Sequence, residues 1–185
     1  MASGDLTTLA DVRAFLGISG EADDQLITRM ITEHSQAIQN YVNRQLTSQD
    51  YAETLDGYGG FTLLLRNYPI TAISSLSVNG RTIPAAAGYS DPGYRFRNYE
   101  VVLNGYRFDR GLMNVEIAYT AGFETVPSDL AGACIKWVAS SYRERERLGQ
   151  ASKQLNGAET VSYIVKDMPD SVKTVLKQYM RVVPL

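Results

Sequence analysis

Cysteine and histidine are almost missing from this 185-residue chain, which holds one of each, Cys134 and His34. Most polar catalysis draws on histidine, cysteine or closely placed carboxylates, and a zinc site usually takes three or four such ligands. A lone histidine and a lone cysteine far apart in the sequence are a poor basis for either chemistry. A single cysteine also excludes an internal disulfide, so we expect the protein to fold in a reducing cytoplasm.

Long apolar runs are lacking too: no segment approaches the roughly 20 residues that a membrane span requires. Residues 1–5 carry neither the basic nor the apolar region of a signal peptide. We therefore expect no membrane association. The composition, 44% hydrophobic and 21% charged, is ordinary for a globular protein, and the length fits one domain, or one domain with an elaboration.

The short motifs of common enzymes are absent, since the sequence contains no G-x-S-x-G, H-E-x-x-H or C-x-x-C. Gly57-Tyr58-Gly59-Gly60 is glycine-rich, but a phosphate loop needs a following Gly-Lys-Ser/Thr and a helix opening there, so we interpret it as a hairpin turn. We expect no cofactor and no metal, and we interpret the chain as a structural subunit. Because a sequence does not show which carboxylates converge in space, a small metal-dependent nuclease or hydrolase stays open as the alternative.

The formal net charge of −2 is unevenly spread along the chain. Residues 1–50 carry a net charge of −4, residues 51–130 of −2 and residues 131–185 of +4. An acidic N-terminal part and a basic C-terminal part suit head-to-tail contacts between like subunits, although ordinary variation along a sequence produces the same pattern. A free DNA-binding module is a third hypothesis, which the total charge does not favour because such modules are clearly basic.

Both ends of the chain show helical periodicity. The first helix should span residues 9–16, with Thr8 as its N-cap and Gly17 as its end. The second should begin at Asp23 and Asp24, where a helix N-terminus favours negative charge, and run to about residue 44. His34 falls on the apolar side of that helix, so we interpret it as a core residue.

The middle of the chain, residues 49–123, changes to strand and turn patterns. Strands are expected at residues 51–55, 61–65, 73–78, 81–83 and 112–119, with a hairpin turn at Asn79-Gly80. A second hairpin around Asn104-Gly105 should join residues 100–103 to residues 106–108. In the last strand, alternate residues should share one buried face. These residues are Met113, Val115, Ile117 and Tyr119.

Helical periodicity returns after Val126-Pro127, with Cys134 on the inward side and Gly149 as the end. We interpret Cys134 as a small core residue. Residues 150–160 are polar and are expected to be a mobile loop, followed by an extended strand at residues 160–165. Met168-Pro169-Asp170 should open a last short helix. Its inward residues should be Val172, Val175, Leu176 and Tyr179.

These patterns predict an α+β fold, in which a small helical bundle is formed by the N- and C-terminal helices and a β-rich insertion lies between them. We divide the chain into N-terminal helices (residues 1–48), the insertion (residues 49–123), and C-terminal helices with the loop and an apolar tail (residues 124–185). All three parts are expected to form one domain.

Two charged stretches are candidate contact surfaces. Residues 143–147 alternate arginine and glutamate near a helix end, which suits a solvated face or a subunit contact. The candidates for the subunit interface are Arg143, Arg145, Arg147, Asp23 and Asp24. Residues 94–99 interleave arginine with aromatic side chains, which is typical of contact with a nucleic-acid backbone but also of an ordinary polar strand. The candidates for contact with passing DNA or with another subunit are Arg95, Arg97, Arg107 and Arg110.

Several short motifs, taken in order, resemble a known protein family. They are Asp5–Ile18 with Asp23–Ile27, then Ala37–Arg44, then Leu63–Ile70 with its Tyr68-Pro69 break, then Val115–Phe123 running into Val126–Leu130, and finally Met168-Pro169 with Val172. This order and spacing resemble the head–tail connector proteins of tailed bacteriophages, which are also called head-completion or adaptor proteins. The likeness covers nearly the whole chain, except residues 84–110 and 149–159, where no family pattern is found.

The resemblance implies a structural virion protein that catalyses nothing. It implies a homo-oligomeric ring of about twelve subunits, stacked beneath the portal protein, that extends the channel for double-stranded DNA and offers a surface to the next tail or head-completion protein. Such a protein is made in the host cytoplasm and acts at the head–tail interface of the virion. The candidate portal-binding residues are Tyr179 and the tail Val182-Val183-Pro184-Leu185, because an apolar segment on a soluble protein is best explained by a partner groove.

Overall fold

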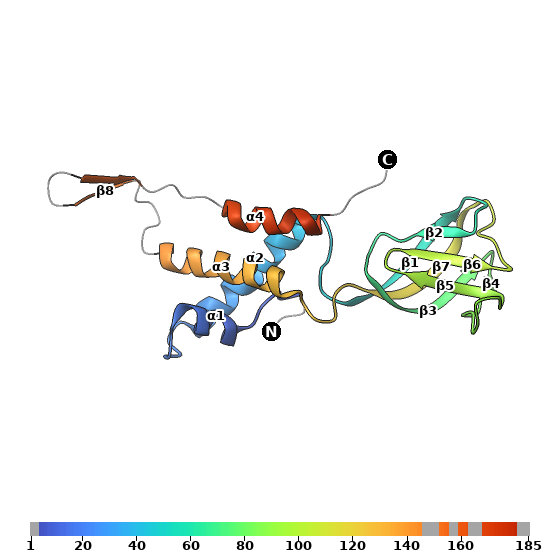
Figure 1. The fold of residues 1–185 in the computed structure, drawn as a ribbon, viewed down its shortest axis with the longest axis horizontal. Coiled ribbons are helices and arrows are strands. Elements are labelled where there is room, and N and C mark those ends of the chain that lie inside the picture. Colours follow the sequence, from blue (N-terminus) through green and yellow to red (C-terminus); the bar gives the residue numbers. More distant parts are fainter. Residues whose placement is uncertain (1–3, 146–151, 156–158, 163–167, 181–185) are drawn as a thin grey trace. The chain divides into compact units, whose positions relative to one another are not determined.

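The computed structural model describes residues 4–145, 152–155, 159–162 and 168–180. Helices occupy both ends of the chain and antiparallel strands the middle (Figure 1), so the predicted α+β class is confirmed. The chain divides into two compact units, one formed by residues 1–44 and 126–185 and one formed by residues 45–125. We call them the helical unit and the β unit.

The first two helices begin and end close to where the sequence predicts. Helix α1 spans Leu9–Leu16, the Thr8 hydroxyl oxygen accepts a hydrogen bond from the Asp11 backbone N–H (3.1 Å), and Gly17 ends the helix in the left-handed conformation. Helix α2 spans Asp24–Val42 and ends at Asn43, which is also left-handed. Asparagine tolerates this conformation because its short polar side chain bonds locally.

The C-terminal part contains two helices and a hairpin. Helix α3 spans Ser128–Glu144, and α4 spans Asp170–Leu176 before a short 3-10 turn, η2 (Lys177–Tyr179). Strands β8 (Ser152–Leu155) and β9 (Glu159–Ser162) pair with each other in antiparallel fashion. Part of the expected loop is therefore regular structure. The two strands pair through backbone hydrogen bonds, and a polar side-chain pattern does not predict such pairing. The expected helix end at Gly149 lies outside the described residues.

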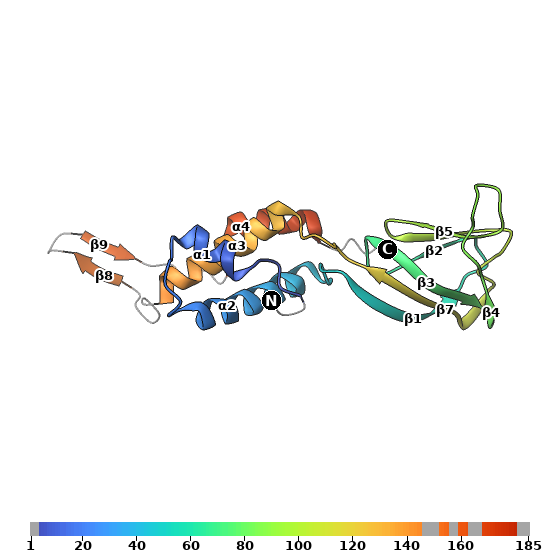
Figure 2. The same ribbon diagram turned by 90° about the horizontal axis from the view of Figure 1, so that it is seen from below.

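The helical unit buries one apolar stripe from each helix. Helix α2 packs against α3, and α3 also packs against α1 and α4 (Figure 2). Burying one aliphatic side chain of this kind stabilises a fold by roughly 1.5–3 kcal/mol. The buried apolar residues of the four helices include Val12, Ile27, Ile31, Ile38, Val42, Leu130, Cys134, Val138, Val172 and Leu176.

The β unit contains two antiparallel sheets. The larger has the order β1-β7-β3-β4, with β1 at Gln49–Gly57, β7 at Gly111–Ala121, β3 at Ile70–Val78 and β4 at Arg81–Thr82. The smaller has the order β2-β6-β5, with β2 at Thr62–Leu64, β6 at Glu100–Asn104 and β5 at Gly93–Arg97. Asn79-Gly80 makes the predicted hairpin turn between β3 and β4.

The two sheets share one hydrophobic core. In β7, Val115, Ile117 and Tyr119 alternate inward as predicted, which is the pattern of a sheet with one buried face. The strands of both sheets and the segment between β6 and β7 supply the remaining buried residues. These include Leu63, Leu76, Val78, Val101, Leu103 and Phe108.

Two expectations for the insertion are wrong. Residues 106–108 form no strand, and β6 pairs instead with β5 across a turn at Asn98 and Tyr99. Asn98 has a φ of +29°, which asparagine tolerates, so it supplies a turn within a stretch of arginines and aromatics. Residues 57–60 are not a hairpin turn, because β1 and β2 belong to different sheets and this segment carries the chain from one sheet to the other.

A bulge interrupts the pairing of β1 with β7. Leu55 lies opposite Val115 and Gly57 lies opposite Gly111, so Asp56 alone faces residues 112–114. The two extra residues of β7 disrupt the ladder here, and the backbone of Met113 leaves the extended conformation, with a φ of +50°. Met113 is consequently exposed (71%), and its expected place on the buried face of β7 is wrong.

The first and last segments of the β unit are hydrogen-bonded to each other, and we call this junction the base of the β unit. The Ser48 N–H donates to the Phe123 carbonyl oxygen (3.1 Å), and the Phe123 N–H donates to the Leu46 carbonyl oxygen (2.8 Å). A Cβ atom on Gly122 would lie 2.4 Å from the Thr47 carbonyl oxygen, and Gly122 has a φ of +113°, which L-residues rarely adopt. The two chain segments can approach this closely because residue 122 is glycine.

Candidate functional site

The described residues form no metal-binding constellation: within them, no three His, Cys, Asp or Glu side chains are placed to hold a metal ion. Among the helices described, none is long and apolar enough to cross a membrane. The two residues with the most reactive side chains, His34 and Cys134, both belong to the packing of the helical unit.

His34 links α2 to α3. Its Nδ1 atom lies 2.8 Å from the Met30 carbonyl oxygen, so Nδ1 carries the proton and donates it, and Nε2 then accepts from the Ser141 hydroxyl at 2.8 Å. The ring packs edge-on against Trp137, with 4.5 Å between centroids. Burial lowers the pKa of His34 below its ordinary value. The interpretation of His34 as a core residue is confirmed.

Cys134 is completely buried on α3. Its Sγ atom lies 3.6 Å from the Ser35 hydroxyl oxygen on α2. Burial raises the pKa of the Cys134 thiol to about 11, so the thiol stays protonated near neutral pH and is a poor nucleophile. The predicted core role of Cys134 is confirmed.

The acids predicted for a subunit interface have partners within the helical unit. Arg13 donates to the Asp24 carboxylate (3.0 Å), while Asp23 accepts a hydrogen bond from the Tyr142 hydroxyl and lies 3.6 Å from Arg145. The guanidinium of Arg145 also lies 3.8 Å from the Tyr142 ring centroid. The Arg13 pair joins α1 to the start of α2, and the contacts of Asp23 join the start of α2 to the end of α3. Partly exposed pairs of this kind contribute about 0–1 kcal/mol each.

Of the remaining candidates for the subunit interface and for portal binding, the structure describes only Arg143 and Tyr179. Arg143 is exposed on α3, whereas Arg147 and Val182–Leu185 lie outside the described residues. The Tyr179 hydroxyl donates to the Asp129 carboxylate (2.7 Å), which ties the end of η2 to the first turn of α3. Burial and this hydrogen bond raise the pKa of Tyr179 to about 12.

The four arginines expected to contact DNA or another subunit all lie in the β unit, and three have partners within the chain. Arg97 pairs with Glu100. Two others lie over aromatic rings. The guanidinium of Arg95 is 5.3 Å from the Tyr89 ring centroid, and that of Arg107 is 4.7 Å from the Phe61 ring centroid. Arg110 is exposed and forms neither an ion pair nor a ring contact with any other described residue.

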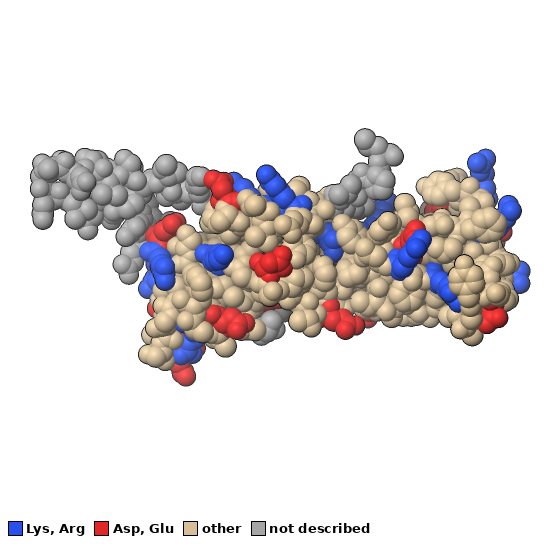
Figure 3. Space-filling view, in the orientation of Figure 1, with Lys and Arg blue, Asp and Glu red and all other residues tan. Residues whose placement is uncertain are grey.

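Positive and negative charge are mixed on the visible face of the protein. On the face drawn in Figure 3, Lys and Arg side chains lie scattered among acidic and uncharged ones. Residues 45–125 together carry a net charge of −2. Affinity for a phosphate backbone comes from neutralising many phosphates at once, which a surface of mixed charge does poorly.

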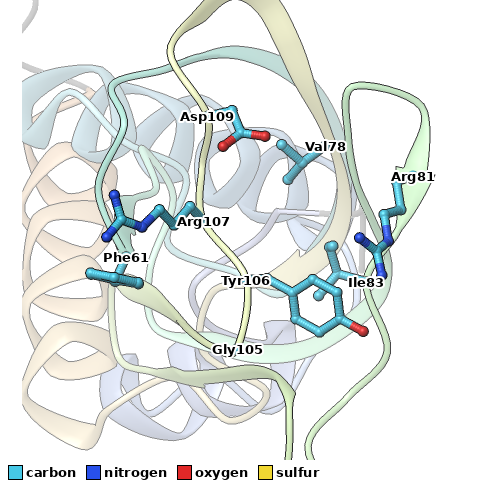
Figure 4. Close-up of a pocket in the computed structure, with 8 residues that line it drawn as sticks. All are labelled: Phe61, Val78, Arg81, Ile83, Gly105, Tyr106, Arg107 and Asp109. Carbon is cyan, nitrogen blue, oxygen red and sulfur yellow. The ribbon is translucent and has the colours of Figure 1, made fainter.

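A hollow of about 510 Å³ in the β unit is lined by one of the predicted arginines, Arg107, and by a further arginine, Arg81 (Figure 4). Arg81 lies 5.0 Å from the Tyr106 ring centroid, on the opposite side of the hollow from Arg107 and Phe61. Sequence reasoning did not single out Arg81, because it follows the β3–β4 turn and is distant in sequence from Arg107. No local pattern reports that proximity.

The bulge displays two large apolar side chains to solvent. Leu112 is 86% exposed and Met113 is 71% exposed. The Met113 N–H donates to the Asp56 carboxylate (2.6 Å), and Met113 has a φ of +50°. This left-handed conformation costs a residue other than glycine about 1 kcal/mol or more.

The side chain of Asn114 holds the bulge in this shape. Its Oδ1 atom accepts from the Gly57 N–H (2.8 Å), and its Nδ2 atom donates to Asn79 Oδ1 (3.0 Å) and to the Asp109 carbonyl oxygen (2.9 Å). One amide thus joins three chain segments, and the strained backbone beside it is fixed by surrounding bonds.

Tyr58 lies at the same end of the larger sheet and is 76% exposed. The residues on either side of it are both close to the segment before β7: a Cβ on Gly57 would meet the Asp109 carbonyl oxygen at 1.9 Å, and the Gly59 N–H donates to the Phe108 carbonyl oxygen (2.6 Å). We call Tyr58, Arg110, Leu112 and Met113 the bulge surface. Sequence reasoning missed it because the alternation of β7 placed Met113 in the core.

Comparison with known proteins identifies the family. The family described as head completion protein matches residues 5–182. The chain belongs to this family. The resemblance inferred from the ordered motifs is therefore confirmed, and the protein is a head completion protein in which the helical unit and the β unit both fall within the match. No curated protein matches the sequence.

Solved structures share the fold of this head completion protein. A chain from the neck of an empty gene transfer agent particle, computed with C6 symmetry, is 21% identical with a TM-score of 0.62, and the alignment covers 100% of this chain and 94% of that one. A chain from the virion of a native gene transfer agent particle is 19% identical with a TM-score of 0.64, with the same coverage. Because both alignments cover the whole chain, they include residues 84–110, where the motifs showed no family pattern.

Proposed function

We propose that this head completion protein is a structural subunit of the connector between head and tail. Its copies form a ring of about twelve subunits beneath the portal protein, extend the channel for double-stranded DNA and provide the attachment surface for the tail. The observation that carries the proposal is the family match over residues 5–182. It is supported by a shared fold with a chain from a particle neck computed with C6 symmetry, since such a ring contains six subunits or a multiple of six.

The protein acts through its surfaces and not through catalysis. His34 and Cys134 are engaged in packing, and the carboxylates of Asp23, Asp24 and Asp129 each bond to an arginine or tyrosine of the helical unit. A nuclease or hydrolase would need carboxylates that converge on one point with room for a substrate or a metal.

Contact with DNA is transient and blind to sequence in this proposal. Arg95, Arg97 and Arg107 are engaged within the β unit, and residues 45–125 carry a net negative charge. A channel of mixed charge lets a polyanion pass, whereas a continuous basic wall would retain it. Steep loss of DNA affinity with salt would instead indicate a dedicated DNA-binding module.

Portal attachment is assigned to the segment Val182–Leu185, with Tyr179 positioning its start. Val172 and Leu176 anchor α4 in the helical core, and the hydrogen bond from Tyr179 to Asp129 fixes the turn from which the segment leaves. Four residues of which none is charged suit an apolar groove on the partner. For contacts between like subunits, Arg143 and Arg147 are the candidates, while Arg145, Asp23 and Asp24 shape the ends of α2 and α3.

Mixing the purified protein with the portal protein from the same genome, and weighing the products by native mass spectrometry, tests the connector proposal. We expect a complex that carries many copies of this chain on one portal ring. A chain that stays alone at every ratio of the two proteins would contradict the proposal.

Removing residues 182–185 should abolish portal attachment and leave the circular dichroism spectrum unchanged, because the helical core ends before this segment. A variant of full length, Val182→Ser with Val183→Ser and Leu185→Ser, is the matched control for chain length. We expect it to fail as the truncated chain does. Wild-type portal binding by the truncated chain would show that the apolar segment is not the attachment site.

A further inference from the structure

We infer that the bulge surface of the β unit binds a protein on the tail side of the virion, through an apolar pocket bordered by a carboxylate. The identity of the partner as a virion protein rests on the connector function proposed above. The residues that make the contact are Tyr58, Arg110, Leu112 and Met113.

Exposure and stiffness together distinguish this surface from ordinary exposed apolar residues. Single apolar side chains on a surface are common and need no explanation. Here Leu112, Met113 and Tyr58 are each more than 70% exposed at one end of one sheet. The composition, with tyrosine, arginine and methionine, matches that of the energetically important centre of protein interfaces.

Exposing these side chains requires a strained backbone, which costs folding free energy. Met113 is held in a left-handed conformation by its bond to Asp56, and the Asn114 amide fixes the neighbouring segments with three hydrogen bonds. An unstrained strand would have turned Met113 inward. A surface whose backbone is fixed before binding loses little conformational entropy when it binds, which is the benefit that strain at a contact surface provides.

The partner is a protein with an acidic rim around its pocket. Arg110 has no carboxylate among the described residues as partner, and a guanidinium beside an apolar contact is best satisfied by an Asp or Glu at the pocket edge. A DNA backbone supplies anions but offers no apolar pocket for Leu112 and Met113.

A second copy of the chain is a poor occupant. The hollow in the β unit is lined by two arginines, Arg81 and Arg107, and by one carboxylate, Asp109, which already accepts a hydrogen bond from Asn79, so Arg110 would meet a net positive charge there. The portal is a poor occupant as well, because the segment proposed to bind it, residues 182–185, belongs to the helical unit. The tail-side protein is the partner that the connector function leaves for the β unit.

The test is reconstitution of particles from phage heads that lack this protein, purified tails and the purified chain. Two readouts are taken: the amount of chain that sediments with heads, and the number of infectious particles after tails are added. The variant Leu112→Ser with Met113→Asn removes the apolar contact while asparagine keeps the left-handed backbone accessible. Arg110→Glu reverses the charge without touching the bulge, and Leu64→Ser, at a half-exposed leucine of β2, is the matched control.

We expect the Leu112 and Met113 double variant and Arg110→Glu each to bind heads as the wild type does and to yield particles at least about tenfold fewer in number. The Leu64→Ser control should match the wild type in both readouts. Equal particle yields from wild type and both bulge variants would overturn this inference and leave the connector function standing. Failure of the wild-type chain to restore particles would overturn the connector function, and this inference with it.

Two further outcomes would name a different occupant and so overturn the inference. A change in the sedimentation coefficient of the free chain caused by the double variant would show that a second copy covers the bulge surface. Weaker retention of the Arg110→Glu variant on double-stranded DNA at low salt, with tail joining unchanged, would show that the surface faces DNA.

Discussion

His34 joins two helices through atoms that an aliphatic core residue would lack. Its ring donates one hydrogen bond to Met30 on its own helix and accepts one from Ser141 on α3, and Trp137 covers one edge. Protonation would force Nε2 to donate toward a hydroxyl that now donates to it, and would place a charge in a half-buried site. The neutral ring is therefore the form that fits the fold.

This arrangement predicts a stability loss in mild acid. The pKa of His34 in the folded protein lies below the ordinary value of 6.5, so the unfolded chain binds the proton first as pH falls. The contribution of His34 to folding is complete above that value and declines below it. Between about pH 7 and pH 5, the urea midpoint of the wild type should fall more than that of His34→Gln, followed by the fluorescence of the single tryptophan, Trp137. Parallel declines in the two proteins would contradict the assignment.

Among the elements, the helices and the β3–β4 hairpin follow from local sequence, whereas the other sheet pairings do not. Thr8 and Gly17 cap α1 by acting on residues within one turn, so both ends of that helix were predictable. The partner of β6 was not, because Asn98 hides the β5–β6 turn within a basic and aromatic stretch. Strand pairing depends on which distant segment completes the ladder, and periodicity within one strand carries no information on that choice.

The candidate site residues also divide into those that local sequence predicts and those that it does not. The core roles of His34 and Cys134 were predictable because helical spacing places both on inward faces. The bulge surface was not, because the direction of Met113 depends on Asp56 and on three hydrogen bonds from Asn114 that cross between chain segments. A sequence signal exists in the polar turn residues that flank β7, but it does not reveal which of them bond.

The closure of the β unit at Gly122 can be tested by a matched pair of glycine substitutions. Gly122 and Gly59 both have positive φ, but only at Gly122 would a Cβ clash with backbone, 2.4 Å from the Thr47 carbonyl oxygen. Gly59→Ala should cost about 1 kcal/mol of unfolding free energy for its backbone conformation alone. Gly122→Ala should cost roughly 2–4 kcal/mol, because the segment around Thr47 must also move. Equal costs in urea unfolding would show that the base of the β unit is loose.

The whole molecule consists of two units, each with its own buried core. The β unit is formed by one contiguous stretch, residues 45–125, whereas the helical unit is assembled from both ends of the chain. The hydrogen bonds of Ser48 and Phe123 close the base of the β unit without help from any helix. A stretch of this size with its own core is large enough to fold by itself.

Residues 45–125 expressed alone should therefore fold. We expect a dispersed amide spectrum by nuclear magnetic resonance and a single cooperative unfolding transition, because the core around Val115, Ile117 and Tyr119 is complete within the fragment. The fragment carrying Gly122→Ala serves as a control with a weakened base. The collapsed spectrum of an unfolded chain from the wild-type fragment would show that the helical unit is needed to hold the sheets.

The closed base at Ser48 and Phe123 also bears on how such proteins diversify. Since the chain enters and leaves the β unit at one backbone pair, recombination at these two points exchanges the stretch between them as a cassette and leaves the helical unit at its original length. Under the tail-side contact inferred above, two phage lineages that share a head but differ in their tails would need to trade only this one contiguous piece of a gene. Heads could thereby acquire new tails while the helical unit, which carries the segment proposed to bind the portal, stays unaltered.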